Sequence, residues 1–204
     1  MDERSDPRKR SYRMVGRVEA AEETRRRIMR AAIELYSRRD HDSVSLQDVA
    51  GQAGVTVQTV LRRFGSKEQL LTASADLATS QVLRQRSTAR PGDIAGAVEN
   101  LLDHYEEWGE RVLRLLAQED RVPAFRVITD RGRELHRDWV EHTFAPLLPT
   151  GDAVRRARRL AQLTAICDVT VWKLLRRDLG LNREQTALAL REMIAALQPA
   201  SAGG

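Results

Sequence analysis

The spacing of apolar side chains along this chain predicts helices over almost its whole length. From residue 20 to residue 39 apolar positions recur every three or four residues, the period of one helix face. Two shorter helices follow within residues 45–70, and a helical pattern then continues to about residue 198. The pattern therefore indicates an all-α fold of about nine helices.

Residues 45–70, SLQDVAGQAGVTVQTVLRRFGSKEQL, have the features of a helix-turn-helix. Ser45, Thr56 and Ser66 precede three helix starts, where their side-chain oxygens can accept bonds from first-turn N–H groups. Gly54 can adopt the positive φ that ends the first helix. A helix pair joined by so short a turn leaves its second helix free to enter the major groove of DNA.

The apolar residues of this segment are spaced to form one buried seam. The seam consists of Val49, Ala53, Val55, Val60 and Phe64. The second helix then directs outward a polar and basic face suited to DNA, made of Val57, Gln58, Thr59, Arg62 and Arg63. An ordinary helical hairpin with a solvated polar face is the alternative, because short matches to this motif also arise by chance.

After a DNA-binding domain of residues 19–70, residues 71–198 are predicted to form a second helical domain. Proline and glycine interrupt its pattern, including a break at Gly109, and Asp93, Asp152 and Asn182 stand at helix starts. About 130 residues are enough for a separate core. The helices expected after the motif are 67–88, 93–108, 110–120, 124–145, 152–179 and 183–198.

Two of these helices, 152–179 and 183–198, are apolar over more than one face, so both need covering on several sides. Such a pair from each of two chains would form a four-helix seam across a twofold axis, and a homodimer through these helices is predicted. The alternative is that both helices are simply central in the core of a monomer.

The net charge of +5 is unevenly distributed. Residues 1–70 contain 15 basic and 11 acidic side chains, whereas residues 71–204 contain 19 and 18. The basic excess therefore accompanies the helix-turn-helix, as contact with phosphates requires. Residues 1–18 contain many basic side chains and no regular spacing of apolar positions. This pattern predicts a flexible arm, which either lies along DNA or only aids solubility. Residues 199–204 predict a disordered tail.

Several other functions lack support in the sequence. No signal-peptide core or bilayer-spanning stretch occurs, so a cytoplasmic protein without a membrane partner is expected. The single cysteine, Cys167, excludes an internal disulfide and is expected to be buried and inert. Asp138 and His142 lack a third metal ligand, and no nucleophile elbow or phosphate-cradling loop is present. We therefore predict no catalytic residue, metal or cofactor.

Residues 24–71, TRRRIMRAAIELYSRRDHDSVSLQDVAGQAGVTVQTVLRRFGSKEQLL, resemble the TetR family of one-component transcriptional regulators. They match its first helix, Ser-led second helix, AGV turn, short recognition helix and F-x-SKE-x-L closure. The resemblance implies that Thr56 and Thr59 contact the DNA backbone and that Lys67 meets a phosphate. It also makes Gln58 and Arg62 the base readers, consistent with bidentate pairing of Gln with adenine and Arg with guanine.

The full set of residues assigned to the DNA-binding face is Ser45, Gln47, Thr56, Val57, Gln58, Thr59, Arg62, Arg63 and Lys67. One departure from the family is Leu61, where a tyrosine that touches the DNA backbone is common. Arg63 is a candidate substitute for that contact.

The resemblance further implies an inducer cavity in the C-terminal domain, where most of the large aromatic side chains lie. A cavity for a small apolar ligand is typically lined by aromatics and a few polar groups. The candidates are Tyr105, Trp108, Trp139, Phe144, Thr164, Asp168 and Trp172. Ordinary core packing is the alternative for aromatics at helical spacing.

These observations predict a ligand-responsive DNA-binding transcriptional regulator. The expected form is a homodimeric repressor, released from a near-palindromic double-stranded operator by a small apolar or amphipathic inducer. An all-α protein-interaction module without sequence-specific DNA binding is the alternative. A helical enzyme has no catalytic constellation to support it.

Overall fold

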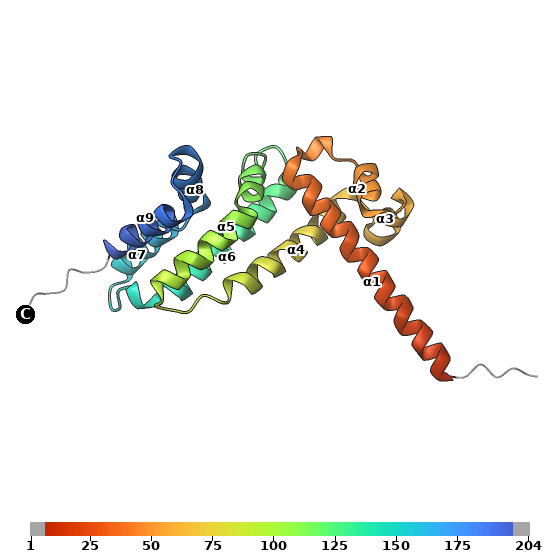
Figure 1. Cartoon of the computed structure of the whole chain (residues 1–204), viewed down its shortest axis with the longest axis horizontal. Coiled ribbons are helices and arrows are strands. Elements are labelled where there is room, and N and C mark those ends of the chain that lie inside the picture. Colours follow the sequence, from red (N-terminus) through yellow and green to blue (C-terminus); the bar gives the residue numbers. More distant parts are fainter. Residues whose placement is uncertain (1–6, 198–204) are drawn as a thin grey trace, which may run out of the picture. The chain divides into compact units, whose positions relative to one another are not determined.

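The structure is a computed structural model that describes residues 7–197, and every element in this range is helical (Figure 1). The predicted all-α fold class is therefore confirmed. The chain divides into two compact units, Met1–Leu77 and Ala78–Gly204, each of which is described by itself. The division lies within α4 (Lys67–Arg86), after Leu77 rather than after residue 70.

The first unit contains α1 (Pro7–Arg38), the 3₁₀ turn η1 (His41–Ser43), α2 (Leu46–Ala53), α3 (Val57–Phe64) and the start of α4. Helix α2 packs against α1 and α3. The predicted seam lies in the core, where Val49 and Val60 are no more than 1% exposed, although Val55 is only half-buried. Each fully buried aliphatic side chain of this size contributes roughly 1.5–3 kcal/mol.

The predicted caps of α2 and α3 are confirmed. Ser45 Oγ accepts a hydrogen bond from Asp48 N at 3.1 Å, and Asp48 accepts one from Ser45 N at 2.8 Å, forming a capping box. Thr56 Oγ1 accepts from Thr59 N at 3.1 Å. Gly54 ends α2 with a φ of 63°, in the left-handed region that favours glycine.

The structure corrects the predicted flexible arm, because α1 extends back to Pro7. Residues 16–20 are exposed, so the missing apolar period does indicate that this part of the chain is not buried. It does not exclude a helix, because Arg, Met, Glu and Ala favour helices without burial and proline is well tolerated at the first helical position. Residues 1–6 and the predicted tail 199–204 lie outside the described residues.

The second unit is built around α5 (Ile94–Leu116), which packs against other helices of the unit. Along the chain follow α6 (Pro123–Thr143), η2 (Ala145–Leu147), α7 (Ala153–Ile166), α8 (Val169–Lys173), the π-helical turn η3 (Leu174–Asp178) and α9 (Arg183–Ala195). Helix α5 contacts α6, α8 and α9, and α7 contacts α6 and α9. The predicted capping residues Asp93, Asp152 and Asn182 each accept a first-turn N–H bond.

The predicted break at Gly109 is wrong, and the expected helices 93–108 and 110–120 form one helix, α5. A Cβ added at Gly109 would lie 2.6 Å from Cζ3 of Trp172. Glycine at this position therefore permits a close approach between α5 and the Trp172 ring. It is not a helix end.

The predicted single helix 152–179 is also corrected, because it divides into α7, α8 and η3. Asp168 has an extended backbone, with a ψ of 150°, and its Oδ1 accepts bonds from Thr170 N and Oγ1 at 2.8 and 2.6 Å. An N-cap of this kind starts a new helix. The apolar pattern continues across the break because Cys167 and Val169 on either side are both buried.

Most of the apolar stripe expected at a dimer seam instead faces the core of its own unit. Leu160 and Leu163 of α7 and Leu190 and Ile194 of α9 belong to one buried cluster with Trp172. This supports the alternative interpretation for these residues.

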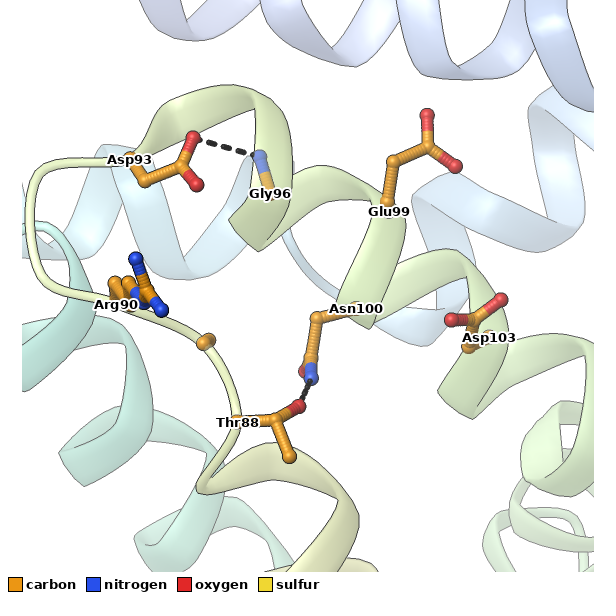
Figure 2. Close-up of a pocket in the computed structure, with 8 residues that line it drawn as sticks. Thr88, Arg90, Asp93, Gly96, Glu99, Asn100 and Asp103 are labelled. Carbon is orange, nitrogen blue, oxygen red and sulfur yellow. Dashed lines mark hydrogen bonds between the residues drawn. The ribbon is translucent and has the colours of Figure 1, made fainter.

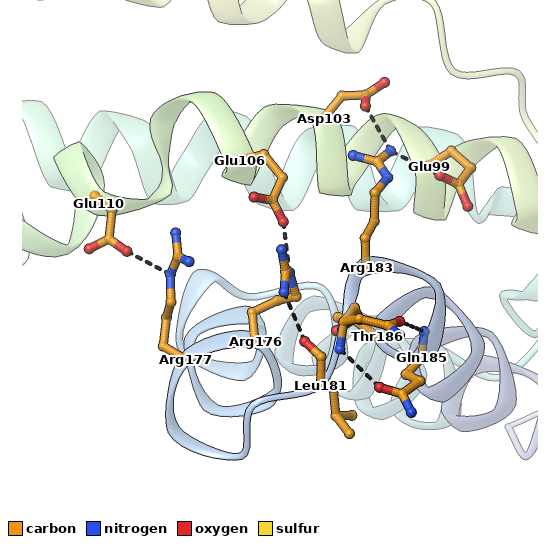
Figure 3. Close-up of polar contacts among 11 residues, drawn as sticks. Glu99, Asp103, Glu106, Glu110, Arg176, Arg177, Leu181, Arg183, Gln185 and Thr186 are labelled. Atoms are coloured by element: carbon orange, nitrogen blue, oxygen red, sulfur yellow. Dashed lines mark hydrogen bonds and ion pairs between the residues drawn. The ribbon is translucent and has the colours of Figure 1, made fainter.

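Arginines from η3 and α9 pair with a row of acidic side chains on α5 (Figure 3). Arg183 contacts Glu99 at 2.9 Å and Asp103 at 2.7 Å. Arg176 contacts Glu106, and Arg177 contacts Glu110. Because these groups are partly exposed, we expect each pair to contribute modestly and mainly to hold the C-terminal helices in register on α5.

Candidate functional site

The outward face of α3 forms the first candidate site. The helix buries Val60 and Phe64, and Thr56 caps its start. Gln58 and Arg62 are both exposed and lie one helical turn apart on the opposite side from the core. This face offers an amide and a guanidinium, which are the groups that address base edges in a groove.

The other residues predicted for this face differ in exposure. Val57, Thr59 and Arg63 are half-buried, whereas three are exposed: Ser45, Gln47 and Thr56. Nε of Arg63 is buried and has no hydrogen-bond partner in the described part of the chain. Leu61, at the position of the family's tyrosine, is 42% exposed.

Lys67 begins α4 and is half-buried. Its Nζ donates to the His41 carbonyl at 2.8 Å, and the His41 ring stacks on Tyr36 with centroids 5.8 Å apart. An ammonium group has three donors, so two remain for a further acceptor such as a phosphate. The contact to His41 holds the head group in place at the start of the helix.

Four of the aromatics predicted to line a cavity come together in the core of the second unit. Tyr105, Phe144 and Trp172 are at most 3% exposed, and Trp139 packs against their cluster. The Trp139 and Phe144 rings are perpendicular, with centroids 6.0 Å apart. Trp108 is buried outside this cluster, with the Arg111 guanidinium 4.7 Å above its ring.

Polar groups in this core are held neutral by burial. Tyr105 donates from its hydroxyl to the Cys167 carbonyl at 2.8 Å, and burial raises the pKa of this phenol. Burial also raises the pKa of Cys167 to about 12, as expected for an inert thiol.

Sequence reasoning missed Arg86 and its neighbours in this core. Arg86, at the end of α4, is only 6% exposed and donates from Nη1 to His136 Nδ1 at 2.9 Å. Burial and the Arg86 charge lower the pKa of His136 to about 4 and that of His104 to about 2. No sequence signal distinguishes this arginine from the solvated arginines around it.

A hollow of about 660 Å³ lies along α7 and includes the two predicted polar residues Thr164 and Asp168. Its remaining lining residues are Arg137, Ala157, Leu160, Ala161, Ala165, Thr170 and Val171.

A second hollow, of about 260 Å³, lies at the turn between α4 and α5 and is mainly polar (Figure 2). Asn100 Nδ2 donates there to Thr88 Oγ1 at 2.8 Å and to the Gln85 carbonyl at 2.9 Å. These bonds fix the end of α4 against α5.

Within the described residues, no three His, Cys, Asp or Glu side chains come together in a metal-binding arrangement. In the same part of the chain no helix has the length and apolar character needed to cross a bilayer.

Comparison with known proteins links the first unit to one family. Residues 28–73 match the model of the bacterial regulatory proteins of the tetR family. A curated relative, the HTH-type transcriptional repressor Rv3405c of Mycobacterium tuberculosis, is 32% identical over 84 residues. That alignment covers 41% of this chain and only 43% of the relative.

Solved structures share the fold over most of the chain. A transcriptional regulator from Rhodococcus sp. Rha1 has a TM-score of 0.66 at 17% identity, over 85% of this chain and 95% of its own. The multidrug binding protein EbrR, in complex with imidazole, has a TM-score of 0.59 at 21% identity, over 89% and 93%. At these identities the likeness shows a shared fold.

Proposed function

Because the chain belongs to the tetR family of bacterial regulatory proteins, we propose that it is a ligand-responsive DNA-binding transcriptional regulator, and specifically a repressor. The observation that carries this proposal is the outward face of α3, where Gln58 and Arg62 are exposed on a capped, well-packed helix. The curated relative named as a repressor supports the sign of regulation, and the EbrR complex supports a small-molecule effector.

DNA recognition would combine base readout with backbone contacts. Gln58 and Arg62 face the major groove, where each bidentate pairing contributes about 1–3 kcal/mol of discrimination. Lys67 supplies a positive charge to a phosphate from the start of α4, where backbone N–H groups also favour an anion. The remaining predicted residues position the helix.

We propose a homodimer, with a near-palindromic operator whose half-sites are about one helical turn of DNA apart. Large apolar side chains that do not join the core stay exposed on the helices predicted to pair, including Val154 of α7 at 75% and Leu188 of α9 at 52%. Ala157, Ala161 and Ala165 form an exposed row of small residues on α7. Burying these residues against a second copy would remove their apolar surface from water.

Release from DNA would follow from a ligand in the second unit. Helix α4 is one continuous helix whose start belongs to the first unit and whose end, at Arg86, is packed in the second. A ligand that changes how the end of α4 is held would change the equilibrium between DNA-binding and non-binding states. To release most of the DNA, it must favour the non-binding state by a few kcal/mol.

The test is a gel shift with DNA from upstream of the protein's own gene, with Arg62→Ala compared with Arg121→Ala. Arg121 is an exposed arginine just before α6, so both variants lose one surface charge. We expect Arg62→Ala to weaken binding to the preferred sequence roughly tenfold or more, and Arg121→Ala to leave it unchanged. The proposal would be refuted if the wild-type protein showed no sequence preference at moderate salt, or if the two substitutions had equal effects.

A further inference from the structure

The core of the second unit contains a cation without an ion-pair partner. Only 6% of the Arg86 surface is accessible, and among the described residues no carboxylate lies within ion-pair distance of it. An isolated buried charge is costly, because the desolvation of a guanidinium is not offset without an anion. Buried charges in proteins are usually paired, so a buried guanidinium without an anion is a candidate for binding one.

Two aromatic rings lie beside Arg86. Its guanidinium lies 4.7 Å from the centroid of the Trp139 ring and 5.8 Å from that of Tyr105. Trp139 Nε1 also donates to the Arg86 carbonyl at 3.1 Å, so the backbone of this residue is fixed as well. The rings stabilise the cation partly and leave most of its five N–H donors without an anionic acceptor.

The hydrogen bond from Arg86 places the His136 ring, which has a donor of its own, beside these aromatic rings. Because Arg86 only donates, the Nδ1 atom of His136 must accept, and the proton of the neutral ring is then on Nε2. Nε2 is buried without a hydrogen-bond partner, as is Nδ1 of His104. The pKa values of both rings are lowered by burial first and then by the Arg86 charge.

One acidic group acts on this cluster from a distance. The Asp168 carboxylate raises the pKa values of Tyr105, His136 and Cys167, but its Oδ1 is held by Thr170. Asp168 and Thr164 also line the hollow of about 660 Å³ on α7.

We propose that the effector of this protein is a carboxylate with an apolar or aromatic body, and that Arg86 is the counter-charge of its carboxylate. The rings of Trp139 and Tyr105 would contact the apolar body, and the free donors of Arg86 and His136 would bind the carboxylate oxygens. The inference rests on the proposed ligand response and names the chemical class of that ligand. Charge-assisted hydrogen bonds of this kind are stronger than neutral ones.

The test measures ligand binding without DNA, by quenching of tryptophan fluorescence in the full-length protein. The probes are benzoate, phenylacetate and octanoate, each paired with its neutral amide. We expect at least one carboxylate to bind, and its amide to bind roughly tenfold or more weakly, the factor for losing one charge-assisted hydrogen bond. Arg86→Gln and Arg86→Met should remove the preference for the carboxylate.

Arg111→Gln is the matched control, because Arg111 also lies 4.7 Å above a tryptophan ring in the same unit. Its carboxylate affinity should equal that of the wild type. No carboxylate binding at millimolar concentrations, equal binding of the amides, or unchanged affinity in the Arg86 variants would each overturn the proposal.

Thermal unfolding without ligand provides a second readout. If Arg86 is kept for a ligand, the ligand-free Arg86→Met protein should unfold at the same temperature as the wild type or higher. A fall of several degrees, or failure to fold, would show that the protein itself compensates the charge and would overturn the proposal. If the wild-type protein does not bind an operator, the proposed function is refuted. The ligand-binding measurement still tests the present proposal in that case.

Discussion

Replacing Gly109 by alanine tests whether the packing of Trp172 requires a glycine inside α5. A Cβ at this position would lie 2.6, 2.8 and 3.1 Å from Cζ3, Cη2 and Cε3 of Trp172. These distances are well inside van der Waals contact. The Trp172 ring is 1% exposed and packs against Tyr105, with centroids 5.8 Å apart, so it cannot move away freely.

Two opposing effects determine the stability of Gly109→Ala. Alanine in a helix interior is favoured over glycine by about 0.8–1 kcal/mol. Overpacking a closed core costs about 1–3 kcal/mol, and the two distances below 3 Å place this site in the upper part of that range. We expect a net loss of about 1–2 kcal/mol, or a few degrees in the unfolding temperature.

Gly132→Ala is the matched control, because Gly132 is an exposed glycine within α6 with no atom within 4 Å of an added Cβ. Thermal denaturation followed by circular dichroism should show a small stabilisation of Gly132→Ala and a destabilisation of Gly109→Ala. Trp172→Phe should reduce the cost of alanine at position 109, because the smaller ring leaves room for the methyl group. If Gly109→Ala raises the unfolding temperature as Gly132→Ala does, the close approach does not constrain the helix.

Two further predictions concern polar contacts. Bonds from Ser45 and Arg39 hold the pKa of Asp48 at about 2. Because the pKa of this carboxyl in the unfolded chain is near 4, its charged form stabilises the first unit at higher pH. This stabilisation is lost as the pH falls toward 2. Ser45→Ala should raise this pKa in an NMR titration, and an unchanged value would refute the importance of the capping box. Arg183→Ala should lower the free energy of unfolding by less than about 1 kcal/mol, because its pairs with Glu99 and Asp103 are partly exposed. The loss should be smaller in high salt, and equal losses at low and high salt would contradict an ionic origin.

Local signals made much of the fold predictable. A cap acts on the turn that follows it, so Ser45, Thr56, Asp93 and Asn182 indicate helix starts without knowledge of the tertiary structure. The outward face of α3 was predictable for the same reason, because a short helix with one apolar seam directs its remaining side chains to solvent. Its contacts with DNA stay predictions.

The errors have different physical causes. Gly109 would end a helix by its propensity alone, and only the packing of Trp172 explains why α5 continues through it. The break at Asp168 was hidden because the apolar pattern is continuous across it. The start of α1 was missed because periodicity reports burial, and an exposed helix has none.

The candidate ligand site combines both kinds of residue. Its aromatic part was predicted, because large apolar side chains at helical spacing are expected in a core. Its charged part was not, because Arg86 is one of many arginines and only the structure shows that it is buried beside Trp139 and His136. Aromatic packing alone is equally consistent with an ordinary core. The buried guanidinium at the end of α4 is the observation that favours the proposed ligand site over that alternative, and it lies on the helix that both units share.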